Sequence, residues 1–172
     1  MTTTLFTNAH IATGESGSTA ASTLPLQDIL VTDGVFTAFG PGLAQQYEAQ
    51  GGDLAAIEVV DLGGKLVCPP FCDTHLHLDY VFTARKPGAV NESGTLFEGI
   101  QRWSETKSDL TVDEIKQRAK IGIKKEMLHG VQFIRSHADV TDPNLTSLKA
   151  LLELKEELKD TVTLQIVSFP QE

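Results

Sequence analysis

Residues 67–79 read VCPPFCDTHLHLD, an apolar segment that ends in a His-x-His pair. Side chains two positions apart on a β-strand point to the same side. On such a strand His75 and His77 can reach one metal ion, while the two leucines that alternate with them pack on the opposite face. Imidazole nitrogen is a good ligand for zinc and for iron(II). The segment therefore predicts a strand whose end binds one divalent metal ion, iron(II) or zinc.

Two alternatives accompany this interpretation. Two histidines that line a barrel and are held by hydrogen bonds would give the same His-x-His pattern. The two cysteines, Cys68 and Cys72, fit no usual zinc spacing, and in a chain that is not exported they should stay reduced. We expect both to be small buried side chains, with metal contact by Cys72 as the alternative.

The composition excludes several classes of function. The chain has 172 residues and a formal net charge of −9, and 41% of its residues are hydrophobic. An acidic chain without a basic stripe is a poor partner for nucleic acid. No apolar run is long enough to cross a bilayer, and the first residues lack the pattern of a secretory signal. We therefore expect a cytoplasmic protein with no membrane or nucleic-acid partner.

The first part of the chain, residues 1–64, has the pattern of short strands joined by tight turns. One strand is expected over 5–11. A hairpin is expected over 27–39 around Asp33-Gly34, because Asp-Gly supplies the positive φ angles of such turns. The segment 57–67 predicts a second hairpin around Gly63-Gly64.

From residue 65 onward, strands alternate with helices. Helices are expected over 95–106 and 111–129, each opened by a Thr-x-x-Glu capping box, and over 142–159. Apolar strands are expected over 131–140 and 161–169. Continuous apolar runs of this kind suit a parallel sheet, and the alternation predicts an α/β sheet or barrel.

A complete (β/α)₈ barrel needs roughly 250 residues, so residues 65–172 can hold only about three of its strands. We expect an incomplete barrel, the N-terminal portion of a TIM-type fold, completed by a C-terminal remainder or a companion chain. The alternative is a small open α/β sheet that closes by itself.

Residues 65–172 resemble the amidohydrolase superfamily, and within it bacterial cytosine deaminase and its relatives. The resemblance runs in order through nearly the whole region, and residues 1–64 agree in kind with the family's small β-sandwich. The matching segments are Pro70-Phe71 before the His pair, SGTLFEGI at 93–100 with Arg102-Trp103, RSHADV at 135–140, and FPQE at 169–172.

The resemblance implies roles for individual residues. His75 and His77 match metal ligands, and Gln171 matches a glutamine that hydrogen-bonds a pyrimidine ring, although an ordinary solvated glutamine is the alternative. The family's remaining ligands and its acid/base glutamate have no counterpart here and are expected beyond Glu172. His137 and Asp139 lie two apart at a strand end, either as a polar pair beneath the site or in contact with substrate or metal ligands.

The implied reaction is metal-dependent hydrolytic deamination of a cyclic amidine, with cytosine converted to uracil and ammonia in pyrimidine metabolism. The Phe-Pro-Gln-Glu ending favours a pyrimidine over an s-triazine, while isocytosine and creatinine stay open as substrates. A catalytically inactive fragment or an interaction module is the alternative from another class. The family also implies a homo-oligomer.

Overall fold

The computed structural model describes residues 2–12, 24–86 and 88–170. It divides into two compact units, Met1–Pro69 and Pro70–Glu172. The division lies five residues after the predicted boundary, because residues 66–67 form a strand of the first unit's sheet. Among the described residues, no helix is long and apolar enough to cross a membrane.

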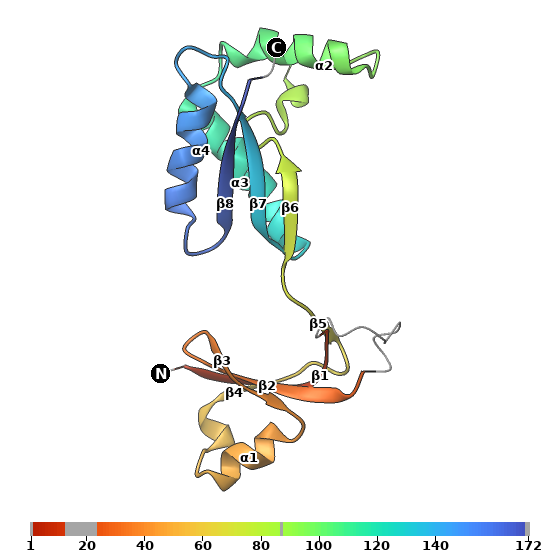
Figure 1. Cartoon of the computed structure of the whole chain (residues 1–172), viewed down its shortest axis with the longest axis vertical. Coiled ribbons are helices and arrows are strands. Elements are labelled where there is room, and N and C mark those ends of the chain that lie inside the picture. Colours follow the sequence, from red (N-terminus) through yellow and green to blue (C-terminus); the bar gives the residue numbers. More distant parts are fainter. Residues whose placement is uncertain (1, 13–23, 87, 171–172) are drawn as a thin grey trace. The chain divides into compact units, whose positions relative to one another are not determined.

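The first unit is built on one five-stranded sheet (Figure 1). Its strands follow the order β3-β2-β1-β4, and β5 also pairs with β1. A short helix, α1, and one 3₁₀ turn, η2, lie between β3 and β4. The elements are β1 (Thr3–Ile11), β2 (Leu26–Thr32), β3 (Val35–Gly40), α1 (Leu43–Ala49), η2 (Leu54–Ala56), β4 (Glu58–Asp61) and β5 (Leu66–Val67).

The structure confirms one predicted hairpin and corrects the other. Strands β2 and β3 pair antiparallel around Asp33 and Gly34, whose φ angles of 49° and 78° suit the turn. The prediction of a second hairpin is wrong, because β4 and β5 do not pair with each other. Both strands pair with β1 and run parallel to it. Gly63 and Gly64 also have positive φ angles, but they move the chain along the edge of β1 instead of reversing it.

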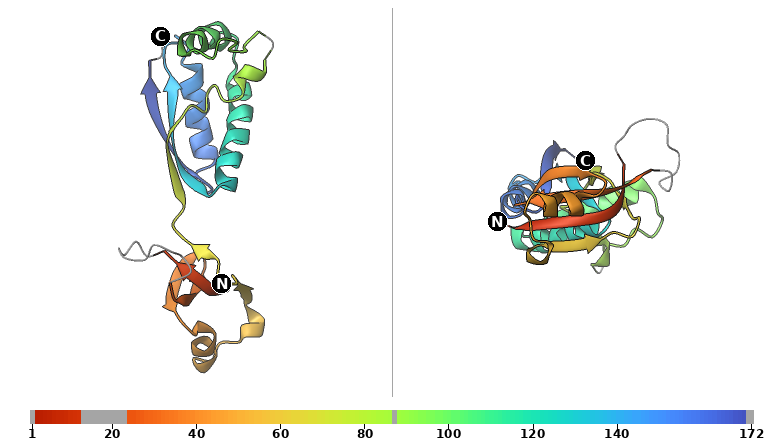
Figure 2. Two further views of the ribbon diagram at one scale, coloured as in Figure 1. Left: turned by 90° about the vertical axis from the view of Figure 1, so that its right-hand side faces the viewer. Right: turned by 90° about the horizontal axis from the view of Figure 1, so that it is seen from below.

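The second unit has a three-stranded parallel sheet in the order β6-β7-β8. Figure 2 shows α3 and α4 on the same face of this sheet. The predicted alternation of strands and helices is therefore confirmed. The elements are β6 (Phe71–Leu76), η3 (Thr83–Arg85), α2 (Leu96–Lys107), α3 (Val112–Leu128), β7 (Val131–Asp139), α4 (Thr146–Glu157) and β8 (Thr163–Phe169).

The core of this unit lies between the sheet and the two helices. On β7, Ile134 and Ala138 are buried against the helices, whereas Phe133 and Arg135 on the other side of the strand are exposed. The sheet thus has one face that the helices cover and one open face. His137 lies two positions after Arg135 on the same strand, so its side chain is on the open face. This arrangement places His137 on the face of the sheet that α3 and α4 do not cover.

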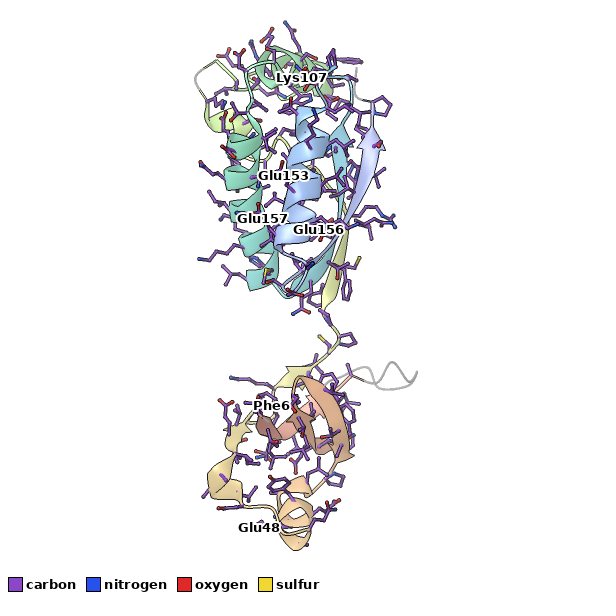
Figure 3. All side chains as sticks on the ribbon, turned by 90° about the vertical axis from the view of Figure 1, so that its left-hand side faces the viewer. Phe6, Glu48, Lys107, Glu153, Glu156 and Glu157 are labelled. Atoms are coloured by element: carbon purple, nitrogen blue, oxygen red, sulfur yellow. The ribbon has the colours of Figure 1, made fainter. Side chains whose placement is uncertain are left out.

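An ion-pair cluster links the outer surfaces of α3 and α4. Lys116 pairs with Glu153 at 2.8 Å and also with Glu157. Lys120 pairs with the same Glu157 at 2.8 Å, and Figure 3 labels both glutamates along α4. The carboxylates raise the pKa of Lys116 through hydrogen bonds and charge. These partly exposed pairs bridge the two helices at the surface of the unit.

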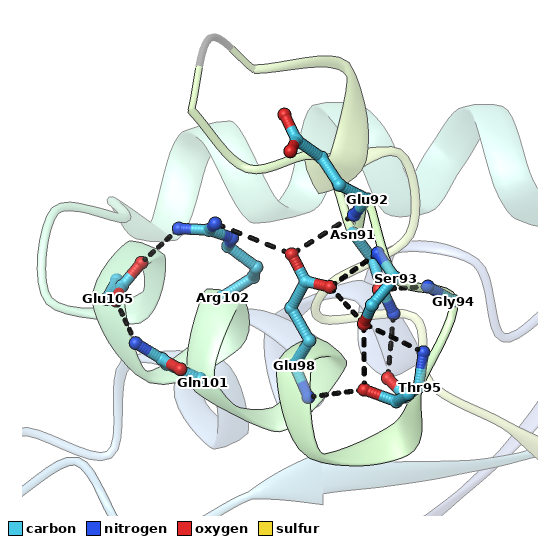
Figure 4. Close-up of polar contacts among 9 residues, drawn as sticks. All are labelled: Asn91, Glu92, Ser93, Gly94, Thr95, Glu98, Gln101, Arg102 and Glu105. Carbon is cyan, nitrogen blue, oxygen red and sulfur yellow. Dashed lines mark hydrogen bonds and ion pairs between the residues drawn. The ribbon is translucent and has the colours of Figure 1, made fainter.

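The predicted capping box at the start of α2 is half present, because Glu98 binds other backbone groups than the one expected (Figure 4). Thr95 Oγ1 accepts a hydrogen bond from Glu98 N at 3.3 Å, as in a capping box. The Glu98 carboxylate does not return to Thr95 N; it accepts from Glu92 N at 3.1 Å and from Ser93 N at 2.7 Å. Hydrogen bonds from the Ser93 side chain and from these backbone groups lower the pKa of Glu98 to about 2. Glu98 therefore ties the preceding loop to the start of the helix.

Candidate metal centre

His75 and His77 lie side by side at the carboxyl end of β6. Their Nε2 atoms are 3.2 Å apart, and the two rings are tilted by 59°. Two imidazole nitrogens bound at 2.0–2.1 Å to one tetrahedral ion would lie about 3.3 Å apart. The separation is that of a hydrogen bond between the two rings, and it is also the spacing that two ligands of one divalent ion require.

His137 joins this pair from the neighbouring strand β7. Its ring stacks on His75 with a centroid separation of 4.1 Å and an interplanar angle of 22°, and it lies 5.5 Å from the ring of His77. The buried Nδ1 of His137 has no hydrogen-bond partner among the described residues. The parallel register of β6 and β7 therefore brings three imidazoles together at one end of the sheet.

Two aromatic residues to which the sequence assigned no role at the site pack against His77. Tyr80 stacks on its ring at 4.7 Å and 26°, and Phe169 from β8 meets it edge-on at 5.2 Å. Burial is the main cause that lowers the pKa of His77, followed by the charges of His75 and His137. A neutral imidazole is the form that can bind a metal.

Asp139 is buried, and its carboxylate is already occupied by hydrogen bonds. Oδ2 accepts from Trp103 Nε1 at 2.5 Å and from Lys107 Nζ at 3.4 Å, and Oδ1 accepts from Thr141 N at 2.8 Å. Burial would raise the pKa of Asp139, but the donors from Thr141 and Trp103 and the charge of Lys107 lower it below its ordinary value. Asp139 is thus an anion that anchors α2 to the end of β7.

A second buried acid, Asp79, ties the ends of β6 and β7 together. Its Oδ2 accepts from Asp139 N at 2.8 Å, and Oδ1 accepts from Tyr80 N at 3.1 Å. One residue earlier, Leu78 N donates to Ser136 Oγ at 3.0 Å. Burial raises the pKa of Asp79 to about 6. The sequence signal for Asp79 is its position two residues after His77, which did not indicate this structural role.

The remaining residues singled out in the sequence, the two cysteines and Gln171, are not part of this histidine cluster as the structure describes it. Both cysteines are exposed, so the expectation that they are buried is wrong; Cys72 lies on β6 beside the exposed Phe133 and Arg135. Within the described ranges, no group of three or more His, Cys, Asp or Glu residues is arranged to hold a metal ion. Gln171 lies outside the described residues.

Several known proteins have sequences and structures similar to those of this chain. Residues 58–161 match the amidohydrolase family. A crystal structure of 5-methylcytosine deaminase from Klebsiella pneumoniae, liganded with 5-fluorocytosine, superimposes with a TM-score of 0.78 and 39% identity, over 98% of this chain and 37% of that one. N-isopropylammelide isopropylaminohydrolase from Burkholderia multivorans gives a TM-score of 0.72 and 25% identity, over 99% of this chain and 38% of that one.

A curated relative agrees with these structures. N-isopropylammelide isopropyl amidohydrolase of Pseudomonas sp. (strain ADP) is 35% identical over 116 residues, which are 65% of this chain and 29% of that protein. The chain thus spans about a third of the length of the relatives that it matches. The similarity confirms the predicted fold class, the first part of an amidohydrolase barrel with its preceding β-domain. The family match covers more than half of the chain, and the chain belongs to the amidohydrolase family.

Proposed function

We propose that this chain forms part of a metal-dependent hydrolase that removes an exocyclic amino group from a nitrogen heterocycle, converting cytosine to uracil and ammonia. The observation that carries the proposal is the 3.2 Å spacing of the Nε2 atoms of His75 and His77 at a strand end. The 39% identity to a 5-methylcytosine deaminase that binds 5-fluorocytosine supports the choice of a pyrimidine.

His75 and His77 would hold one divalent ion, iron(II) or zinc. When bound, such an ion supplies hydroxide near neutral pH for attack on the ring carbon that bears the amino group. Burial, the main cause that lowers the pKa of His77, favours the neutral imidazole, which is the form that binds a metal. Tyr80 and Phe169 cover the sides of the ring and restrict water there.

The remaining functions need residues that this chain does not supply in the described ranges. A general acid/base carboxylate must carry a proton to the leaving nitrogen so that ammonia departs. We place it, with the further metal ligands, beyond Glu172 in the remainder of the barrel or in a companion chain. We assign Gln171 to the substrate, because its amide offers a donor and an acceptor to an N–C=O ring edge. His137 is a candidate for substrate contact beside the ligands.

A second candidate reaction has support of its own. The 35% identity to an N-isopropylammelide hydrolase favours an s-triazine substrate from which an alkylamine is released instead of ammonia. The two reactions share hydroxide attack on an amidine carbon and differ in the ring and in the leaving amine. The interaction-module alternative has no observation that favours it over these reactions.

The test begins with the intact mass of the purified protein and of any polypeptide that copurifies with it. The complete assembly, loaded with zinc or iron(II), is then assayed with cytosine, 5-methylcytosine and N-isopropylammelide, measuring ammonia and isopropylamine separately. We expect ammonia from the pyrimidines. Release of isopropylamine alone would favour the triazine reaction, and no turnover by a complete, metal-loaded assembly would contradict both.

His75→Ala tests the metal ligand directly. The exposed neighbour on the same strand, Thr74→Ala, is the matched control. We expect the His75 variant to lose its metal, because a site that loses one of its few ligands binds the ion far more weakly, while the control keeps it. Equal metal content in both variants, measured by elemental analysis, would remove the basis of the proposal.

A further inference from the structure

Helix α2 is attached to the end of β7 through the only tryptophan of the chain. Trp103 is 5% exposed, and its Nε1 donates to Asp139 Oδ2 at 2.5 Å. Hydrogen bonds to an ionised acceptor are roughly twice as strong as neutral ones. The indole is therefore held in one orientation relative to the strand end.

The same indole contacts the residue that packs on a candidate metal ligand. The rings of Trp103 and Tyr80 lie 4.7 Å apart at 45°, and Tyr80 in turn stacks on His77 at 4.7 Å and 26°. Offset and tilted aromatic pairs at these separations are attractive. A continuous series of contacts thus runs from Asp139 through Trp103 and Tyr80 to His77.

The backbone around His77 is fixed by other interactions. Leu78 N is bound to Ser136 Oγ, and Asp79 Oδ2 binds the backbone of β7. Arg118 from α3 donates to the carbonyl oxygens of Val81 at 2.6 Å and of Asp79 at 3.1 Å. These bonds fix the backbone but not the rotation of the His77 imidazole about its side-chain bonds. That rotation is restricted by the contact of Nε2 with His75 Nε2 at 3.2 Å, by the edge of Phe169 and by the stacked Tyr80 ring, of which only Tyr80 is in turn in contact with Trp103.

We propose that Trp103 is a positioning residue for His77: held by Asp139, it fixes Tyr80, and Tyr80 fixes the orientation of the His77 ring. The inference rests on the proposed function only in taking His77 as a metal ligand. Hydrogen-bonded partners that orient ligand imidazoles typically change metal affinity 10–100-fold when they are removed, and we expect the lower end of this range for a residue that acts through packing. Helix α2 would then contribute to the metal site without contacting the ion.

The test uses the complete assembly, in which the further metal ligands are present, and two measurements. The first is the side-chain NMR resonances of His77 without metal, which shift in the field of the stacked Tyr80 ring. The second is Zn²⁺ affinity by calorimetry. Trp103→Phe keeps an aromatic ring and removes the Nε1 donor, and Tyr80→Leu removes the stacking ring. Lys107→Met is the matched control, because it removes another donor to Asp139 while leaving Trp103 and Tyr80 in place.

We expect Trp103→Phe and Tyr80→Leu each to move the His77 resonances toward those of a free histidine and to weaken Zn²⁺ binding about tenfold. Lys107→Met should leave both near the wild-type values. Unchanged His77 resonances in either variant would overturn the proposal, as would an equal change in Lys107→Met, which would assign the effect to the charge balance at Asp139.

The outcomes separate this inference from the proposed function. If the wild-type complete assembly binds no Zn²⁺ at His75 and His77, the metal-ligand assignment fails, yet the His77 resonances still show whether Trp103 positions the ring. A Trp103→Phe chain that does not fold, judged from its backbone amide spectrum, leaves Tyr80→Leu and Lys107→Met to decide.

Discussion

Ser136→Ala probes the connection between β6 and β7 that holds the candidate site together. Ser136 is fully buried, and its Oγ accepts a hydrogen bond from Leu78 N at 3.0 Å. Alanine removes the acceptor but adds no bulk, so the backbone N–H of the fully buried Leu78 is left without this partner. An unsatisfied buried donor costs about 1–3 kcal/mol. Since 1.4 kcal/mol is about tenfold in an equilibrium constant, the folding constant should fall roughly 5- to 150-fold.

The assay is urea unfolding of wild type, Ser136→Ala and the control Ser168→Ala, followed by circular dichroism. Ser168 lies on the adjacent strand β8 and is exposed, so its loss should change the free energy of unfolding by less than about 0.5 kcal/mol. If both variants lose equally little stability, the Leu78–Ser136 bond does not hold the strand ends, and our account of the fixed backbone around His77 is refuted.

Three further predictions concern the helices and the substrate. Glu98→Gln should lower the free energy of unfolding at pH 6. The difference from wild type should shrink as the pH falls from about 4.5 toward 2, because a carboxyl group with a depressed pKa stabilises the fold only in its ionised form. Glu105→Gln is the control, and a difference in the free energy of unfolding that does not change with pH would contradict the reasoning. Leu151→Ala should lower the free energy of unfolding in urea by about 2–5 kcal/mol, because Leu151 is fully buried. The control is Leu152→Ala, which should lower it by less than about 1 kcal/mol, because Leu152 is 47% exposed. Equal losses would show that the buried face of α4 is misassigned. In the complete assembly, Gln171→Ala should lower turnover while the metal content stays constant, and a parallel loss of metal would show that its assignment to the substrate is wrong.

The network around Asp79 and Asp139 gives the strand ends two distinct supports. Asp79 binds backbone groups and sets the separation of β6 and β7, whereas Asp139 binds side chains of α2. Because α2 is attached through Trp103, changes in that helix can reach the His77 ring without altering the sheet. We therefore expect substitutions in α2 at Trp103 to alter the geometry of the site more than the stability of the sheet.

Local sequence patterns determined most of the elements of this protein. The helices begin at Thr95 and Thr111 because a threonine oxygen can accept from the N–H three residues later, within one turn of chain. The Asp33-Gly34 hairpin and the shared side of His75 and His77 follow from the same kind of short-range geometry. Each signal lies within a few residues, so the sequence can carry it alone.

Only the tertiary structure decided which distant groups meet. Asp79 binds a backbone N–H 60 residues away, and Trp103 binds a carboxylate 36 residues away. The parallel pairing of β4 and β5 with β1, and the exposure of Cys72, likewise depend on which strand edge and which sheet face are covered. These contacts leave no periodic pattern, because they arise from the packing of separate elements. The sequence therefore identified the histidines, and the fold supplied the residues that surround and orient them.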